Sequence, residues 1–374
     1  MKITLVQCIL AKPPSDIWAW VRLRTDRGLE GWGEYTGNPL TDASVSAVIG
    51  ALAPGLVGKD LSGAGEALEA VRRWRYPSHM DNRSIVMAVS ALDMALWDLR
   101  AREQGVSLAR LLGGREEREI PLYANLNRLL RKDRSLSKLI VSARTAVEDG
   151  MPMVKIAPFD EVTPLEERPD VEPGLERWRE TGREIGQNRL SVDCHCRFQN
   201  AAFRKMILDL GAEAQSPLFW EDPVRIHRAC DLSYLSRELP GLRLASGEDC
   251  FAAQELRELS QSGQLAILNP DLKYIGGVTA AFSLLPELME RVNVCLHNPS
   301  GPIATAHSAH VSSLLGKDTL LEFAYGDQNA RNQALAGGEP VERGRYVLSS
   351  KPGVGVEPSL SFLERYGSIV KEVG

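Results

Sequence analysis

The feature that most restricts how this chain can fold is a series of eight short apolar segments, each ending near a polar or charged residue. They are IPLYAN (120–125), MVKI (153–156), LSVD (190–193), LFWE (218–221), LRLASGE (242–248), LAILNPD (265–271), VNVCLH (292–297) and LLEF (320–323). A stretch of helical length follows each one, and such alternation is typical of parallel βαβ units. Eight units within about 205 residues predict a closed α/β barrel at the short end of the usual size range.

The sequence on either side of this barrel predicts a smaller second unit. Residues 1–118 contain strand-like runs, followed at 84–105 by apolar side chains at helical spacing without Pro or Gly. The last part, 340–374, contains GVGVEPS, which favours a turn between short strands. We therefore expect an α+β domain at 1–118, a barrel at 119–339, and a tail that returns to the first domain.

Composition and charge exclude several classes of function. The 374 residues are 44% apolar with a formal charge of −5, and the basic residues are scattered among acids, so nucleic acid and membrane surfaces are not expected partners. The first apolar run is broken early by Pro13 and Pro14, too soon for an export signal or anchor. The six cysteines show no disulfide framework. We expect a cytoplasmic protein with reduced thiols.

Polar side chains recur at the ends of the predicted barrel strands. In chain order they are Lys155, Asp193, Glu221, Glu248, Asp271, His297 and Glu322. The last six are 23 to 28 residues apart, about one βα repeat. Because active sites of such barrels lie at the carboxyl ends of the strands, we expect these side chains to converge on one cavity.

Asp193, Glu221 and Glu248 follow three consecutive strands. Three converging carboxylates repel one another unless a cation lies between them, and hard oxygen ligands favour Mg²⁺. A single carboxylate after a strand is more often a helix cap or an ion-pair partner. Three in succession favour a metal site.

Asp271 and His297 follow neighbouring strands, six and seven. A carboxylate beside an imidazole fixes its tautomer and suits it to act as a general base. A lone histidine at a strand end is more often a core residue with satisfied hydrogen bonds. The preceding acid and the carboxylates opposite favour catalysis here.

Several motifs together resemble those of the enolase superfamily, in its mandelate racemase subgroup. They are MAVSALDMALWDLRAREQGVSLARLLGG (87–114), VDCH, FWEDP, SGED, NPDLKYIGG, LHNPSGPIA and KPGVGVE, in family order over nearly the whole chain. The resemblance implies a modified TIM (β/α) barrel, an N-terminal capping domain completed by the C-terminal tail, and a homo-oligomer, a dimer or an octamer. It also implies Mg²⁺ on Asp193, Glu221 and Glu248, stabilising an enediolate formed by removal of the proton α to a carboxylate.

The chain departs from the subgroup after the second barrel strand, where Lys-x-Lys is common. Here the tripeptide is Lys155-Ile156-Ala157, so a second base is missing. Racemisation at one carbon needs a proton acceptor on each face, and we therefore disfavour it. Lys155 has two readings, contact with the enediolate or an ion pair with a metal-binding carboxylate.

The stretch VDCHCRF places four possible metal ligands side by side, from Asp193 to Cys196. If the strand stays extended, Asp193 and His195 face the cavity while Cys194 faces the helices, which disfavours a zinc site. Asp193-x-His195 resembles the galactonate and mannonate dehydratase branch, in which a histidine here protonates a departing β-hydroxyl.

The resemblance therefore implies a dehydratase of a sugar acid, an aldonate or an aldarate. His297 takes the α-proton, His195 protonates the leaving hydroxyl, and the product becomes a 2-keto-3-deoxy acid. Glu322 is expected to bind the substrate or act as an electrophile, or else is a structural carboxylate. The alternatives are an epimerase or cycloisomerase using the same enediolate, and a barrel that binds sugar acids without catalysis.

Substrate specificity is expected from the Gly-rich segment GWGEYTGNP (31–39), read as a mobile lid whose Glu34, Tyr35 and Thr36 face the substrate. Four other histidines are not assigned to the site. His307 and His310 are read as one face of the seventh helix, and His79 and His227 as surface or domain-contact residues.

Overall fold

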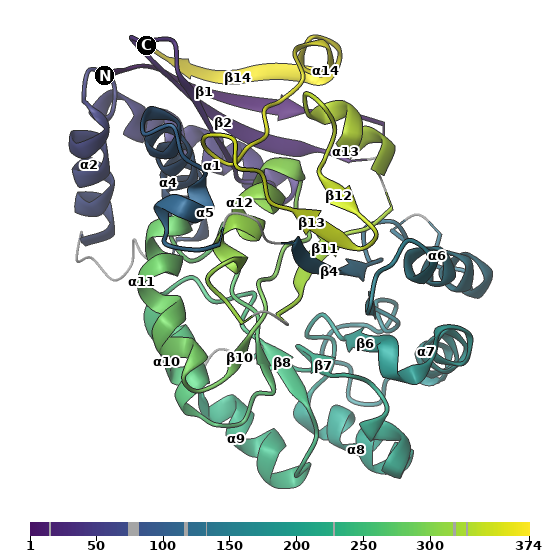
Figure 1. The fold of residues 1–374 in the computed structure, drawn as a ribbon. Coiled ribbons are helices and arrows are strands. Elements are labelled where there is room, and N and C mark those ends of the chain that lie inside the picture. The colour runs from purple at the N-terminus through teal and green to yellow at the C-terminus, as the bar shows by residue number, and fades with distance from the viewer. Residues whose placement is uncertain are drawn as a thin grey trace.

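The computed structural model describes residues 1–14, 16–73, 82–115, 119–131, 133–226, 229–316, 319–326 and 328–374. His79 and His227 lie outside the described residues. Figure 1 shows two units. One is an antiparallel sheet with its own helices, and the other is a barrel surrounded by helices. The α/β fold with a capping domain and a modified TIM barrel is thus confirmed. No helix in the described ranges is both long and apolar enough to cross a membrane.

The capping domain is built on a four-stranded antiparallel sheet in the order β14-β1-β2-β3. Its strands are β1 (Ile3–Ala11), β2 (Trp18–Thr25), β3 (Glu30–Glu34) and β14 (Gly367–Val373). The last strand lies beside the first, with Val6 opposite Val373. The C-terminal tail therefore completes the capping domain, and both chain ends lie on it (Figure 1).

Helices cover this sheet, and most residues of the longest helix, at 83–103, are buried. They are α1 (Pro39–Leu52), α2 (Leu61–Arg73), α4 (Arg83–Glu103) and α5 (Leu108–Leu111), with a 3-10 turn at Ala53–Gly55. A side chain on Gly31 or Gly33 would meet a backbone oxygen of α4 at 2.3 or 2.1 Å. The glycines of GWGEY thus let β3 approach α4 closely, a packing role instead of lid mobility.

The barrel contains eight parallel strands at the positions predicted from the sequence. They are β4 (Glu119–Asn125), β5 (Val154–Ile156), β6 (Leu190–Asp193), β7 (Trp220–Glu221), β8 (Leu244–Ser246), β9 (Ile267–Leu268), β10 (Asn293–Val294) and β11 (Leu321–Ala324). Neighbouring strands pair from β4 to β10, and β11 pairs with β4. The N–H of Glu322 donates to the carbonyl of Leu296 at 3.4 Å, which joins the remaining pair and closes the ring.

Helices alternate with these strands and lie outside the ring (Figure 1). They are α6 (Leu136–Glu148), α7 (Glu172–Ile185), α8 (Asn200–Leu210), α9 (Ala229–Glu238), α10 (Ala253–Gln261), α11 (Gly277–Met289), α12 (Pro302–Ser312) and α13 (Gln328–Ala334), with 3-10 turns at Gln187–Arg189 and Gly211–Gln215. A hairpin of β12 (Val341–Glu342) and β13 (Arg345–Val347) adds to β4 antiparallel. From there α14 (Leu360–Tyr366) leads the chain back to β14.

Helix α12 joins the two units and carries both histidines of its predicted face. His307 donates from Nε2 to the carbonyl of Trp32 at 2.8 Å. His310 donates from Nε2 to the carbonyl of Val354 at 3.1 Å and accepts the N–H of Ala109 at Nδ1, at 3.0 Å. Both rings are fully buried, so they serve the junction between barrel and capping domain.

Candidate active site

A cavity of about 390 Å³ lies at the carboxyl ends of the barrel strands. Its lining joins the predicted catalytic residues to loops of both units. The predicted residues are Thr36, Asp193, His195, Glu248 and His297; others include Arg83, Asn127, Arg128, Arg131, Asp160 and Lys273. Strand-final side chains thus converge as the barrel geometry requires.

The carboxylates of the third, fourth and fifth strands are placed by the barrel register. Asp193 and Glu221 are directly opposite each other on β6 and β7, and Glu248 follows β8 by two residues. Burial raises the pKa of Glu221 well above its usual value, with Asp193, Glu322 and Glu248 adding to the rise and Lys155 opposing it. The acids are therefore close enough to repel one another.

Lys155 supplies positive charge beneath this cluster. Its Nζ lies 2.6 Å from Glu221, 2.9 Å from Glu322 and 3.6 Å from Asp193, and its side chain is fully buried. Burial opposes the charged form, but Glu221 and Glu322 outweigh it and raise the pKa of Lys155. The ammonium thus forms ion pairs with carboxylates, the second of its two predicted roles.

As their side chains stand, no three His, Cys, Asp or Glu residues in the described ranges are arranged to hold a metal ion. The donor set nevertheless fits one. Glu221 Oε2 is buried without a hydrogen-bond partner, so it has a free acceptor in a place where water is excluded. Asp193, Glu221 and Glu248 offer only hard oxygen atoms, the ligands that Mg²⁺ prefers.

His297 lies between two carboxylates. Its Nδ1 is 2.9 Å from Asp271 Oδ2, and its Nε2 is 2.9 Å from Glu248 Oε2. Lys273 Nζ lies 2.6 Å from the same Asp271 oxygen and also contacts Ser300. Burial opposes ionisation of Asp271, yet Lys273 and His297 outweigh it and hold its pKa below the usual value. Asp271 is therefore an anion that fixes the imidazole.

His195 reaches the cavity by a turn, not by an extended strand as expected. β6 ends at Asp193, and His195 has φ of 45°, in the left-handed region. Its Nε2 is 3.0 Å from Asp193 Oδ2 and its Nδ1 is 2.5 Å from Asp160 Oδ1. Burial would lower the pKa of His195, but these two acids raise it to about 11. The two carboxylates thus favour the protonated ring.

The residue before this histidine in VDCHCRF lies in a different environment. Cys194 is fully buried among apolar core residues, and burial raises the pKa of its thiol well above the usual value. Zinc binds the thiolate, which this position disfavours.

Glu322 is fully buried at the end of β11. Its Oε1 contacts Lys155, its Oε2 accepts the N–H of Asn298 at 2.9 Å, and the same oxygen is 3.9 Å from His297 Nε2. These contacts give Glu322 a structural role beside His297.

Glu34, Tyr35 and Thr36, the predicted substrate-binding residues of the segment 31–39, lie in different environments. Glu34 accepts the N–H groups of Gly301 and Ala304, at 2.6 and 2.8 Å, and so caps the start of α12. Tyr35 is buried, with its hydroxyl 2.9 Å from that of Ser46. Of the three, Thr36 lines the cavity, and its Oγ1 accepts the N–H of Ala19 at 3.0 Å.

Sequence reasoning did not find four residues that complete the site: Asn127, Arg134, Asp160 and Lys273. Asn127 donates to Asp193 at 2.9 Å, and Arg134 lies 2.5 Å from Asp160, the partner of His195. All four lie in loops beyond the strand ends, where periodicity gives no signal. A search for charged residues shortly after each strand could have found Asp160, in VKIAPFD, and Lys273, in NPDLK.

Comparison with known proteins agrees with this architecture. The chain is 27% identical over 369 residues to a D-galactonate dehydratase of Pectobacterium atrosepticum, covering 96% of this chain and 92% of the relative. A solved structure of a dehydratase protein, so described, from Salmonella enterica superposes with a TM-score of 0.87 at 21% identity, covering all of both chains. A mandelate racemase/muconate lactonizing protein from Paracoccus denitrificans, complexed with magnesium, gives 0.85 at 21% identity, with 99% of each chain covered.

Two family models match consecutive parts of the sequence. Residues 15–113 match the N-terminal domain of the mandelate racemase / muconate lactonizing enzymes, and residues 138–361 match the enolase C-terminal domain-like family. The second match alone covers more than half of the chain. The chain therefore belongs to the mandelate racemase and muconate lactonizing enzyme family of the enolase superfamily.

Proposed function

We propose that this protein is a hydro-lyase, a Mg²⁺-dependent dehydratase that converts a sugar acid, an aldonate or an aldarate, into a 2-keto-3-deoxy acid. One observation carries the proposal: His297, which pairs with the buried Asp271, and His195, which pairs with Asp160, line the same cavity. They follow β10 and β6, which are four strands apart in a ring of eight. A base and an acid on opposite sides suit loss of a proton and a hydroxyl from adjacent carbons.

His297 is the proposed base, acting through Nε2. Asp271 holds Nδ1, so Nε2 is the nitrogen left to accept the α-proton. Glu248 contacts that nitrogen and has to move away from it before the proton can transfer. His195 is the proposed acid that protonates the leaving β-hydroxyl, held by Asp160 and Asp193.

Asp193, Glu221 and Glu248 would hold the Mg²⁺ ion. When bound, the ion would supply positive charge to stabilise the negative charge that develops on the substrate carboxylate. Lys155 orients Glu221 and Glu322 through its ion pairs. The dehydratase relatives support this choice of reaction, and the absence of a second lysine at Ala157 speaks against racemisation.

The test is a screen of the purified protein with Mg²⁺ against aldonic and aldaric acids, with D-galactonate included. Keto acid is detected with semicarbazide, and proton exchange at C2 by NMR in D₂O. Keto acid that disappears with a chelator and returns with Mg²⁺ supports the proposal. Deuterium incorporation without keto acid would indicate an epimerase or cycloisomerase. No reaction, with no effect of Asp193→Asn on ligand binding, would indicate a non-catalytic barrel.

We further propose that the chain binds a small-molecule sugar acid and associates with copies of itself, and we expect neither nucleic acid nor a membrane as a partner. The described cysteines Cys8, Cys194, Cys196, Cys250 and Cys295 are free thiols, which suits the reducing cytoplasm. A homo-oligomer, a dimer or an octamer, is expected and can be measured by light scattering.

A further inference from the structure

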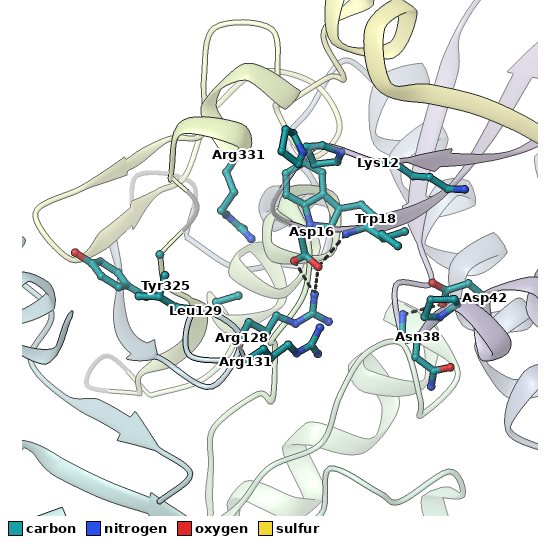
Figure 2. A pocket seen from close by; sticks show the side chains of 17 residues that line it. Lys12, Asp16, Trp18, Asn38, Asp42, Arg128, Leu129, Arg131, Tyr325 and Arg331 are labelled. Atoms are coloured by element: carbon teal, nitrogen blue, oxygen red, sulfur yellow. Dashed lines mark hydrogen bonds and ion pairs between the residues drawn. The ribbon is translucent and has the colours of Figure 1, made fainter. Parts of the chain in front are cut away.

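A second cavity, of about 600 Å³, adjoins the first on the side of the capping domain. Its walls come from residues 12–14 and 16–18, the loop after β3, the loop after β4 and the segment after β11 (Figure 2). Gly37, Asn38, Arg128 and Arg131 line both cavities. A substrate that extends from the catalytic histidines toward this opening therefore passes the loop after β4.

That loop carries three arginines at intervals of three residues, and two of them are neutralised. Arg128 donates to both oxygens of Asp16, at 3.1 and 2.8 Å. Arg134 lies 2.5 Å from Asp160 and donates to the carbonyl of Ala157 at 3.0 Å. Their positive charges are therefore already matched within the protein.

Arg131 is the arginine between them, and no carboxylate of the described residues forms a direct ion pair with it. Within the described ranges its guanidinium has no hydrogen bond or ion pair, and Figure 2 shows it beside Arg128 with no interaction drawn to it. Partial burial of the side chain lowers the pKa of Arg131, and repulsion from Arg128 and Arg134 adds to the effect, while the more distant Asp16 and Asp160 oppose it. The guanidinium remains charged, because arginine does not lose its proton in proteins. An exposed, unpaired cation thus stands where the two cavities meet.

We propose that Arg131 binds a second anionic group at the far end of the substrate, so that the preferred sugar acid carries two anions, not one. The group that Arg131 binds is a terminal oxyanion. An aldarate carries it as a carboxylate, and a 6-phosphoaldonate carries it as a phosphate. Guanidinium pairs with either group through two parallel hydrogen bonds. An anion at Arg131 also relieves the repulsion among the three arginines. This inference rests on the proposed function, since it assigns the substrate class of that reaction.

The experiment compares substrates that differ only at the terminal carbon: an aldonate, the matching aldarate and the matching 6-phosphoaldonate, beginning with the galacto series. kcat and KM are measured for the wild type, Arg131→Gln, Arg131→Lys and the control Lys138→Gln. Lys138 is an exposed cation on α6 that does not line either cavity. We expect Arg131→Gln to lower kcat/KM for the dianionic substrates about tenfold or more, mainly through KM. Arg131→Lys should restore part of the loss, with the aldonate and Lys138→Gln affected little.

The better of the two dianionic substrates then identifies the terminal group. Equal losses for all three substrates, or no loss, overturn the inference while leaving dehydration itself intact. If no acid turns over, the proposed function fails, and isothermal titration calorimetry with D-galactarate decides the role of Arg131. Binding that Arg131→Gln weakens supports the anion site, and binding unaffected by it, or none, overturns it.

Discussion

His297 and His310 are both buried and only thirteen residues apart, yet their pKa values are shifted in opposite directions. Burial favours a neutral imidazole at both positions. At His297, after β10, Glu248, Glu322 and Asp271 outweigh burial and raise the pKa well above its usual value. At His310, in α12, burial prevails and lowers the pKa to about 4.

The two histidines differ in the groups that their ring nitrogens contact. The ring of His310 meets a backbone carbonyl and a backbone N–H, which satisfy a neutral imidazole completely. The ring of His297 meets carboxylates on both nitrogens. A strand end in this barrel therefore collects charge and a helix at the domain junction excludes it, so the first region is suited to proton transfer and the second to stability.

Removing the base tests the first region most severely. His297→Asn should reduce both C2 exchange and keto acid formation by about 10²- to 10⁴-fold, because the amide that replaces the imidazole cannot accept the α-proton. Semicarbazide detection and NMR exchange measure the two steps, and the melting temperature checks the fold. Full exchange in this variant would assign the base elsewhere.

Removing the acid separates the two steps. His195→Asn should reduce keto acid formation by about 10²-fold or more while leaving exchange at C2 within severalfold of the wild type. His297 still takes and returns the proton, but the hydroxyl is no longer protonated as it departs. If both steps fall together, His195 acts on proton abstraction or on the metal ligands, not on the leaving group.

The sequence was sufficient for the framework of this site because barrel geometry converts strand order into position. Eight βα units in one closed ring bring Asp193, Glu248 and His297 together at the same end of the barrel. Periodicity could not show how the side chains pair there. Lys155 lies among carboxylates and His195 enters by a left-handed turn, because loop conformation and charge neutralisation decide those details.

The segment GWGEYTGNP (31–39) is a second place where the sequence does not indicate how the side chains are arranged. The glycines of this segment predict mobility, but close approach of β3 to α4 requires Gly31 and Gly33. The sequence predicts substrate contacts for Glu34 and Tyr35, whereas the structure gives them partners in α12 and α1. A polar residue in a Gly-rich segment has no period to indicate which way it faces.

Glu34→Gln tests the junction without touching the base or the acid. The neutral amide cannot accept both N–H groups of α12 as well as a carboxylate does, so we expect a loss of about 2 to 4 kcal/mol in the free energy of unfolding. KM and kcat of the folded fraction should change little. Urea unfolding and steady-state kinetics measure the two effects, and Glu30→Gln, which alters a half-exposed acid paired with Arg24 at the other end of β3, is the control. A rise in KM at unchanged stability would instead place Glu34 in contact with substrate.

His310 predicts a smaller effect that depends on pH. Its pKa is about 4 in the folded protein and about 6.5 in an unfolded chain, so between these values the unfolded state binds more protons. Stability is therefore complete above pH 6.5 and falls as the pH drops toward 4, by about 2 kcal/mol from this residue between pH 7.5 and pH 5. His310→Gln should cost stability at pH 7.5, because the N–H of Ala109 loses its acceptor, and should make the decline toward pH 5 shallower by that amount. Urea unfolding of both proteins at the two pH values measures it. An unchanged decline would mean that the ring is already protonated in the folded state, and the contrast between His310 and His297 would then disappear.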